Sequence, residues 1–312
     1  METRRIGQLE VSVVGLGGNN FGMALDAAGT RQVLDAAIDA GVTYVDTADL
    51  YGGGASEEHL GAALQGRRDA VVLATKFGHS GSTPPERPGG SPAWVREATE
   101  ASLRRLGTDH VDHLMIHQPD PSTPIEETLG ALDELVREGK AREIGCSNFS
   151  ADQLREADAA ARREGTARFA SVQNHYSLLT RAAETEGVLD ACAELDVGFV
   201  PFFPLESGLL TGKYRKGQDL PEGSRLANWG PRASRFINDE RLEVVERLRA
   251  YAEGKGHHLL ELSLGWLVSN PTVSSVIAGA TKTGQVHDNA AAAMTWPLSP
   301  AERAEVDALL AG

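Results

Sequence analysis

The stretch VVGLGGNN, residues 13–20, decides between two folds that the rest of the sequence allows. An apolar run leads into glycines, as in a doubly wound dinucleotide-binding fold, where GxGxxG opens a helix after the first strand. Here Asn20 stands in place of the third glycine. Gly279 and Gly284 have the spacing of a phosphate-binding P-loop, but Gln285 and Val286 follow instead of Lys and Ser or Thr. Because both nucleotide motifs fail, a closed barrel is favoured.

On either side of this stretch, short apolar runs alternate with amphipathic segments. Eight runs are typical of buried strands: residues 11–16, 43–46, 70–75, 111–116, 142–146, 170–173, 198–203 and 274–277. The helical patterns between and after them cover residues 31–40, 57–64, 93–106, 125–138, 152–163, 184–195, 240–253, 259–269 and 285–294. Eight strand–helix units predict a (β/α)8 TIM barrel with extra helices and long loops at its carboxyl face. An open doubly wound sheet is the alternative, since alternation alone does not prove closure.

Composition limits the classes of partner. The chain has 312 residues, 41% of them hydrophobic, with a formal net charge of −14 and a pI of about 5.1. No composition break divides it, so we expect one domain over residues 1–312. An acidic surface disfavours nucleic acid and anionic membranes, which leaves a small molecule as the expected partner. No apolar run approaches the roughly 18 residues that span a bilayer. Cys146 and Cys192 lack disulfide or metal spacing, and a cytoplasmic location fits best.

Polar residues follow the strand runs at their carboxyl ends, which form the active-site face of a barrel. In YVDTADLYGGG, residues 44–54, the strand closes on Asp46 and Tyr51 stands just beyond it. Taken in order, the strand ends are Asp46, Lys76, His117, Ser147 with Asn148, Gln173, Phe202 and Gly279. One ionisable residue at a strand end is usually a solvated rim residue. An Asp, a Lys, a His and a Tyr that converge on one face predict a catalytic site.

These four residues can divide the work of a carbonyl reduction. A tyrosine titrates near 10, so it donates a proton well only beside a cation that stabilises the phenolate, and Lys76 is placed to lower its pKa. Asp46 would hold the buried lysine charged. His117 would direct or polarise the carbonyl oxygen. No side chain supplies a hydride, so a nicotinamide cofactor is implied.

Six stretches in this order resemble the aldo-keto reductase family. They are DTADLYGGGASE, VVLATK, DHVDHLMIH, GKAREIGCSNF, VQNHYSLL and GLLTGKY, and the likeness runs from about residue 4 to residue 289. The resemblance implies a (β/α)8 barrel with NADPH extended across the carboxyl ends of the strands. It also implies that Asp46, Tyr51, Lys76 and His117 are the catalytic tetrad, with Tyr51 as the general acid. The glycines after Tyr51 would let backbone approach the substrate pocket closely.

The resemblance further implies a set of cofactor-binding residues, in which we also include Asp46. Those expected at the nicotinamide and its ribose are Gly18, Asn19, Ser147, Asn148, Gln173 and Phe202, the last in place of a common tyrosine. Those expected at the pyrophosphate are Leu205, Gly208, Lys213 and Arg225, and those around the adenosine are Gly279, Thr281, Gln285 and Asn289. Many relatives place an arginine at the 2′-phosphate, whereas this chain offers Lys282. NADPH is the expected cofactor, and NADH use stays open.

We expect Asn20, Phe21, Tyr51, His117 and Trp229 to line the substrate pocket. The partner would be a small carbonyl compound or alcohol, since the same tetrad can work in either direction, and no pattern predicts an oligomeric state. A redox-sensing subunit that binds nicotinamide nucleotides with little turnover is the alternative function. A metal-dependent hydrolase built from Asp46, Asp49 and His117 is disfavoured, because Lys76 would repel the metal, so no metal site is predicted. His110 and His113 are expected to be solvated or to face helices.

Overall fold

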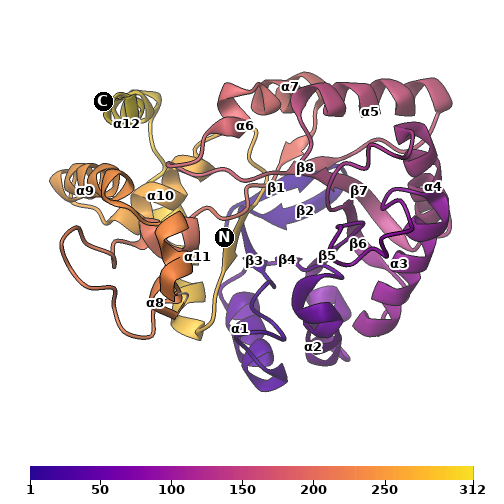
Figure 1. Ribbon diagram of the computed structural model, residues 1–312, viewed down its shortest axis with the longest axis horizontal. Helices are drawn as coiled ribbons and strands as arrows, with labels where there is room; N and C mark the ends of the chain where they lie inside the picture. The colour runs from indigo at the N-terminus through magenta and orange to yellow at the C-terminus, as the bar shows by residue number, and fades with distance from the viewer. Residues whose placement is uncertain (229, 312) are drawn as a thin grey trace.

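The chain forms a ring of parallel strands surrounded by helices (Figure 1). This computed structural model describes residues 1–228 and 230–311. The barrel strands are β3 (Val14–Gly17), β4 (Tyr44–Asp46), β5 (Val72–Phe77), β6 (Val111–Ile116), β7 (Ala141–Ser147), β8 (Ser171–Gln173), β9 (Gly198–Phe199) and β10 (Val276–Gly279). They pair in the order β10-β3-β4-β5-β6-β7-β8-β9, all parallel.

Backbone hydrogen bonds close the ring between its two end strands. The Phe199 N–H donates to the Thr272 carbonyl over 2.9 Å, and the Ile277 N–H donates to the Pro201 carbonyl over 3.0 Å. These bonds join β9 and the residues after it to β10 and the segment that leads into it. The prediction of a closed barrel is therefore confirmed, and the open doubly wound sheet is excluded.

The helices pack side by side around the outside of the strands. Their bounds are α1 (Ala27–Asp39), α2 (Ala55–Leu64), α3 (Pro92–Leu106), α4 (Ile125–Arg137), α5 (Ala151–Glu164), α6 (Ala182–Thr185), α7 (Val188–Leu195), α8 (Arg225–Asn228), α9 (Asp239–Gly254), α10 (Leu259–Val268), α11 (Thr283–Thr295) and α12 (Pro300–Ala311). Each of α1 to α4 contacts the next helix, α5 contacts α7, and α11 contacts α1. Helices α9 and α12 pack together outside this ring (Figure 1). Among the described residues, no helix is both long and apolar enough to cross a bilayer.

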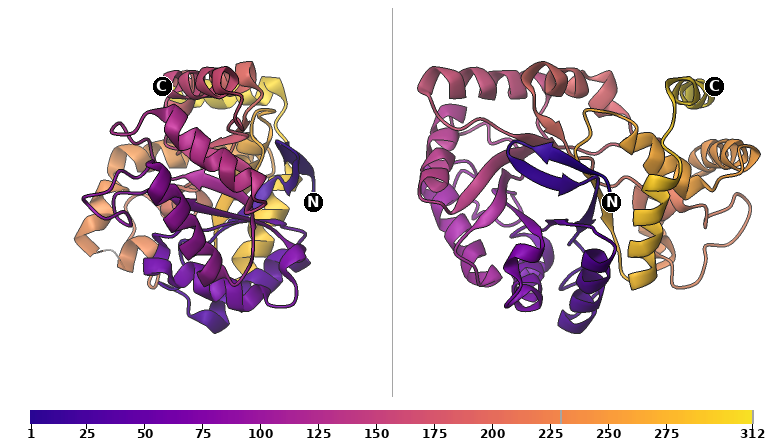
Figure 2. Two further views of the ribbon diagram at one scale, coloured as in Figure 1. Left: turned by 90° about the vertical axis from the view of Figure 1, so that its right-hand side faces the viewer. Right: turned by 180° about the vertical axis from the view of Figure 1, so that it is seen from behind.

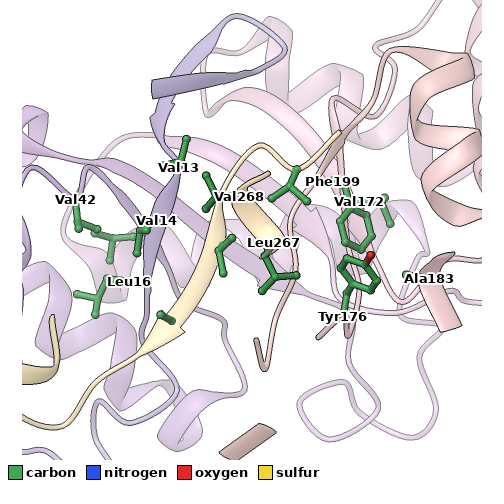
Figure 3. Close-up of a cluster of buried hydrophobic side chains, with 14 of the residues drawn as sticks. Val13, Val14, Leu16, Val42, Val172, Tyr176, Ala183, Phe199, Leu267 and Val268 are labelled. Atoms are coloured by element: carbon green, nitrogen blue, oxygen red, sulfur yellow. The ribbon is translucent and has the colours of Figure 1, made fainter. Parts of the chain in front are cut away.

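Two layers of apolar side chains hold the barrel together. The larger fills the space between strands and helices, and Figure 3 shows part of it, including Val14, Leu16, Val172 and Phe199. The smaller fills the barrel interior and its floor with Ile6, Leu9, Val11, Tyr44, Ala74, Met115, Ala170, Val200 and Ile277. Residues within a strand thus divide between the two layers by alternation, as a barrel requires.

The amino terminus departs from the prediction. The apolar run 11–16, expected to be one strand, is divided between β2 (Leu9–Ser12) and β3. β2 pairs antiparallel with β1 (Thr3–Ile6), and this hairpin lies across one end of the barrel (Figure 2). The Ser12 hydroxyl donates to the Val14 carbonyl, which fixes the corner between β2 and β3. A continuous apolar run carries no signal for such a corner.

Other boundaries also differ from the expected ones. The helix predicted over 184–195 is broken at Gly187, whose φ of 75° is left-handed, into α6 and α7. The strand predicted over 198–203 ends as β9 at Phe199, although Phe202 forms an isolated bridge to His175. The sequence analysis missed α12, which follows a Ser299 cap that accepts a hydrogen bond from the Glu302 N–H.

His113 points into the barrel and not towards solvent or the helices, contrary to the prediction. It has no exposed surface. Its Nδ1 is hydrogen-bonded to the Tyr44 hydroxyl at 2.8 Å and its Nε2 to Ser171 Oγ at 3.2 Å. Burial, together with the charge on Lys76, lowers the pKa of His113 to about 3, so the ring is neutral. A polar layer therefore crosses the barrel.

Arg4 joins the hairpin to the end of α10. Its guanidinium donates to the Asn270, Val273 and Val268 carbonyls over 3.0, 2.6 and 2.7 Å. We predict that Arg4→Met lowers the free energy of unfolding by about 2–3 kcal/mol, because hydrogen bonds from a charged donor are lost and buried carbonyls are left unpaired. The matched control is Arg5→Met, since the Arg5 side chain is exposed. Urea unfolding at pH 7 measures both, and equal losses would contradict this role for Arg4.

Candidate active site

The predicted tetrad comes from three neighbouring strands and lies together at the carboxyl face. Asp46 ends β4, Lys76 lies near the end of β5, and His117 follows β6. Lys76 Nζ donates to Asp46 Oδ2 over 2.7 Å and to the Thr47 carbonyl over 2.8 Å. The same ammonium group donates to the Tyr51 hydroxyl over 3.3 Å. One buried cation is thus shared by a carboxylate and a phenol.

Lys76 carries its charge although it has no exposed surface. Burial lowers the pKa of the ammonium group, but Asp46 and Tyr51 raise it by more, so the pKa lies above its ordinary value. The pair is nearly solvent-free, since Asp46 is only 2% exposed. Removing either partner would leave an uncompensated charge in a low-dielectric interior.

The pKa of Tyr51 differs from the expectation. Burial raises it, Lys76 opposes this, and Asp46 and Asp49 add to the rise, so that the pKa lies above the ordinary value of 10.0. Lys76 therefore pulls in the expected direction, but burial outweighs it. The phenol is protonated at neutral pH and can donate. The cation stabilises the phenolate only as the proton leaves, which is when a catalyst needs it.

His117 presents a neutral ring beside the phenol. The two rings meet edge to face with centroids 5.9 Å apart. Burial, Lys76 and His79 together lower the pKa of His117 to about 2. Its Nδ1 is buried and has no hydrogen-bond partner among the described residues. A neutral imidazole can offer an N–H to a carbonyl oxygen without adding a second positive charge to the site.

Three glycines shape the turn that carries Tyr51. Gly52, Gly53 and Gly54 have φ values of 61°, 67° and 99°, in the left-handed region that side chains with a Cβ avoid. A Cβ on Gly52 would lie 3.2 Å from the Gly22 carbonyl oxygen. The turn therefore brings the phenol back over Lys76 and packs against the loop after β3.

The ends of β7 and β8 bear the amides expected at the nicotinamide. Gln173 Nε2 donates to Asp46 Oδ1 over 3.0 Å, so this amide also supports the tetrad carboxylate. Ser147 Oγ donates to the Gln173 carbonyl, and Asn148 Nδ2 donates to Ser147 Oγ and to the His117 carbonyl. These hydrogen bonds fix the orientation of the Asn148 and Gln173 side chains through their amide nitrogens. The structure thus brings Ser147, Asn148 and Gln173 to the edge of the tetrad.

The loop after β9 contains the residues expected at the pyrophosphate. Leu205 and Gly208 lie in or beside a 3-10 turn over Glu206–Thr211. Gly208 has a φ of 95°, and a Cβ there would lie 2.9 Å from Lys213 Nζ. The glycine therefore allows the ammonium group to sit against the turn. Phe202 begins this loop and stacks on His175 with ring centroids 5.5 Å apart.

The ends of β3 and β10 meet on the other side of the site. The Gly18 N–H donates to the Asp46 carbonyl over 2.7 Å. A Cβ on Gly279 would lie 3.4 Å from the amides of both Asn19 and Asn20. Arg225 Nη2 donates to Asn20 Oδ1 over 2.9 Å, which brings the start of α8 to this edge.

The residues expected around the adenosine surround the start of α11. The Thr281 N–H donates to Gln285 Oε1 over 2.8 Å, and Lys282 is the residue before the helix. Asn289 lies two turns away by its position in the helix and is buried, at 7% exposure. Helix N-termini favour anions, because their first N–H groups lack partners within the helix.

Lys213 and Lys282 differ from the other lysines of the chain, all of which are described. Neither pairs with a described carboxylate. The others do so: Lys76, Lys140, Lys216 and Lys255. In a chain with a net charge of −14, two cations that lack counter-ions near one face indicate a place for an anion.

The substrate residues expected from the sequence are not all at the surface of the site. Phe21 has no exposed surface and packs in the outer core, and Asn20 is 7% exposed. Trp229 lies outside the described residues. Phe203, which the sequence analysis passed over, is 40% exposed beside Phe202.

Asp49 and His79 lie beside the tetrad, although the sequence did not predict them as part of this site. The Asp49 carboxylate accepts a hydrogen bond from Ser82 Oγ over 3.0 Å and is 9% exposed. The His79 ring lies edge-on to His117 at 5.0 Å. Asp49 belongs to the quoted stretch 44–54, so its position was visible, but its burial depends on the loop after β5.

Comparison with known proteins identifies the family. A model described as the aldo/keto reductase family matches residues 13–311. The chain is 37% identical over 306 residues to a protein of Arabidopsis thaliana named probable voltage-gated potassium channel subunit beta, covering 96% of this chain and 93% of that protein.

Two further relatives are named as reductases. The L-glyceraldehyde 3-phosphate reductase of Escherichia coli (strain K12) is 32% identical over 299 residues, covering 93% of this chain and 86% of the relative. The aldo-keto reductase str7 of Strobilurus tenacellus is 36% identical over 306 residues, covering 94% of this chain and 87% of the relative.

Asp49 gives the site a measurable pH dependence. Burial raises its pKa from 3.8 to about 6. Below pH 4 the carboxyl is protonated in both the folded and unfolded chains, so burial costs little. Between pH 4 and pH 6 the unfolded chain ionises first, and above pH 6 the full cost of the buried charge is present. We predict that the free energy of unfolding of Asp49→Asn, relative to that of the unmodified protein, rises by on the order of 2–3 kcal/mol as the pH increases from 4 to 7. Urea unfolding of both proteins at pH 4 and pH 7 measures this. A difference in unfolding free energy between the two proteins that is the same at both pH values would refute the prediction.

Proposed function

The chain belongs to the aldo-keto reductase family, and from this premise we propose that it is an NADPH-dependent reductase of aldehyde or ketone carbonyls, or that it catalyses the reverse reaction and oxidises the matching alcohols with NADP+. The observation that carries the proposal is the cluster at Lys76. A buried, charged lysine touches a protonated phenol and is held by Asp46, with a neutral His117 beside it.

The residues present fit a nicotinamide dinucleotide phosphate. The fit rests on Lys213 and Lys282, which pair with no carboxylate in the described part of the chain, on the start of α11, and on the Ser147 hydroxyl and the Asn148 and Gln173 amides beside the tetrad. Lys213 and Arg225 would hold the pyrophosphate, Lys282 the 2′-phosphate, and the amides the carboxamide. The cofactor, when bound, supplies the hydride.

The proton chemistry follows from the chain's own residues. In the reducing direction the Tyr51 hydroxyl gives its proton to the carbonyl oxygen, and the Lys76 ammonium group stabilises the phenolate that forms. The His117 imidazole donates a hydrogen bond to the same oxygen and orients the carbonyl. In the oxidising direction the phenolate accepts the proton of the alcohol. Asp46 keeps the lysine charged throughout, and Gln173 holds Asp46.

A regulatory subunit that binds nicotinamide nucleotides with little turnover is the second candidate. The similarity to a protein named as a probable potassium channel beta subunit favours it. The two candidates differ in turnover. A reductase oxidises NADPH repeatedly with an accepted carbonyl compound, whereas a regulatory subunit stops after about one equivalent of NADPH per protein molecule. A screen of aldehydes and ketones with NADPH and NADH in parallel decides between them.

The cofactor assignment predicts an affinity difference. NADPH should bind more tightly than NADH, and Lys282→Ala should narrow the gap, because a charged contact to the 2′-phosphate contributes about 1.5–3 kcal/mol. The matched control is Lys213→Ala, which should weaken both cofactors alike, since both carry the pyrophosphate. Fluorescence titration of the three proteins with each cofactor gives the six dissociation constants. Equal affinities of the unmodified protein for NADPH and NADH would defeat the assignment.

The mechanism predicts the effect of removing the phenol hydroxyl. Tyr51→Phe should leave NADPH affinity nearly unchanged and lower turnover by at least about 10²–10⁴-fold, the usual contribution of general acid catalysis. Lys76→Met should act similarly, because without the cation the pKa of Tyr51 rises further. The double variant should be little worse than either single one, since the pair acts as a unit.

Tyr44→Phe is the control for losing a buried phenol in the same part of the barrel, because among the described residues the Tyr44 hydroxyl is hydrogen-bonded only to His113. It should cost stability and leave turnover within a few-fold of normal. Steady-state kinetics on one accepted aldehyde measure all four variants. A Tyr51→Phe enzyme with near-normal turnover would rule out the mechanism.

A further inference from the structure

The loop after β9 holds a strained backbone. Phe203, Glu206 and Ser207 have φ values of 51°, 47° and 56°, and none of them is glycine. Left-handed conformations cost free energy for residues with a Cβ, so they persist only where surrounding contacts hold them. The loop also contains Phe202, Leu205, Gly208 and Lys213, for which we propose cofactor contacts.

The Glu206 carboxylate supplies such contacts from inside the loop. It is 5% exposed. Its Oε1 accepts hydrogen bonds from His175 Nε2 at 2.8 Å, Thr180 Oγ1 at 2.8 Å and Ser177 Oγ, and its Oε2 accepts one from Arg241 Nη2 at 2.6 Å. The donors lie in the segment after β8 and in α9. One carboxylate therefore ties three separate parts of the chain together.

Glu206 is an anion under all conditions in which the protein would work. Burial raises its pKa, but the hydrogen bonds from His175, Ser177 and Thr180, together with the charge of His175, lower it by more, and the pKa lies at about 2. A buried carboxylate is a poor means of gaining stability, because its desolvation offsets most of the attraction to its partners. Its use here therefore suggests a role in fixing one conformation.

His175 connects Glu206 to the two aromatic side chains of the loop, Phe202 and Phe203. While its Nε2 binds Glu206, its ring stacks on Phe202 at 5.5 Å with an interplanar angle of 22°. The same ring meets Phe203 edge to face at 5.6 Å, and the two phenylalanines contact each other at 5.3 Å. If the His175 ring rotated, Phe202 would lose the ring on which it stacks.

We propose that Glu206 is a positioning residue: through His175 and the strained backbone it holds Phe202 and the loop of residues 202–213 in the shape that accepts the cofactor before the cofactor binds. The inference rests on the proposed function for the identity of the ligand. The claim that Glu206 orders the loop does not depend on the proposed function. Glu206 touches neither the phenol nor the lysine, so it acts on affinity and not on proton transfer.

The first test uses cofactor-free protein. The N–H groups of Glu206, Gly208 and Leu210 donate to carbonyls within the loop and report its order by hydrogen exchange. Glu206→Ala should speed exchange of these amides by about tenfold or more, because the loop opens locally. Glu206→Gln should rescue much of the protection, since its amide oxygen can still accept from His175, Ser177 and Thr180.

Asp112→Ala is the matched control. Asp112 is also a buried carboxylate, 2% exposed, and it binds two guanidinium groups, Arg68 and Arg142, near the start of β6. This variant should lose stability and leave exchange in the β9 loop slow. Equal acceleration in the two Ala variants would show that Glu206 contributes only to global stability.

The second test is NADPH affinity by fluorescence titration. If only a fraction of the Glu206→Ala molecules has the competent loop, the dissociation constant rises in inverse proportion to that fraction, by about tenfold. Turnover at saturating NADPH should change by less than about threefold, because the tetrad is untouched. A loss confined to turnover, with unchanged affinity, would overturn the proposal.

A double-variant cycle tests the path through His175. His175→Phe keeps a ring against Phe202 but removes the N–H that binds Glu206. If both changes break one connection, Glu206→Ala combined with His175→Phe should bind NADPH little worse than Glu206→Ala alone, whereas the losses from independent roles would add. Fully additive losses would overturn the role of His175.

Failure of the proposed function gives a different pattern. An unmodified protein that binds neither NADPH nor NADH would refute the proposed function and the ligand named here, while the exchange data would still decide whether Glu206 orders the loop. Normal NADPH binding by a folded Glu206→Ala variant with a slow-exchanging loop would refute the positioning role alone.

Discussion

The buried pair of Lys76 and Asp46 is the constraint on which the site depends. An ammonium group with no exposed surface is tolerable only beside an anion and with its remaining N–H groups satisfied, and here Asp46 and the Thr47 carbonyl do both. The carboxylate in turn needs a second donor, which Gln173 supplies from β8. β4 and β5 are neighbours, but β8 lies four strands away from β4 in the order of the sheet. Only a closed ring brings their ends close enough for these bonds, so the electrostatics of the site and the closure of the barrel require each other.

Burial and the charge of Lys76 together keep the two nearest histidines neutral. Burial is the main reason that the pKa values of His113 and His117 are low, and the positive charge of Lys76 is the next cause for both. His113 then serves as a neutral hydrogen-bonding residue between Tyr44 and Ser171 inside the barrel. His117 is neutral beside a protonated Tyr51. His117 and Tyr51 are thus two uncharged donors where the oxygen of the proposed carbonyl substrate would lie, His117 because burial and Lys76 lower its pKa and Tyr51 because burial outweighs Lys76.

The sequence predicted well what depends on strand ends and poorly what depends on contacts between distant segments. Asp46, Lys76 and His117 could be placed together because parallel strands end on one face, and eight alternating units implied the closed ring. The corner at Ser12 could not be read from an uninterrupted apolar run, nor could the break at Gly187 in a helical pattern. The raised pKa of Tyr51 depends on burial, which the sequence does not show locally. Glu206 looks like an ordinary loop glutamate until His175 and Arg241 approach it.

The two halves of the proposed site are therefore built differently. The groups that handle the proton stand on strand ends or on a turn fixed by glycines, are almost fully buried, and have bonds that the barrel itself imposes. The groups expected to hold the cofactor stand largely on loops, with two lysines that pair with no described carboxylate and a strained segment held by one carboxylate. Rigid strands keep the proton-transfer groups at fixed distances from one another. A long ligand, by contrast, can be released only if a loop that contacts it can open. Chemistry and affinity can then change independently, because different contacts set each of them.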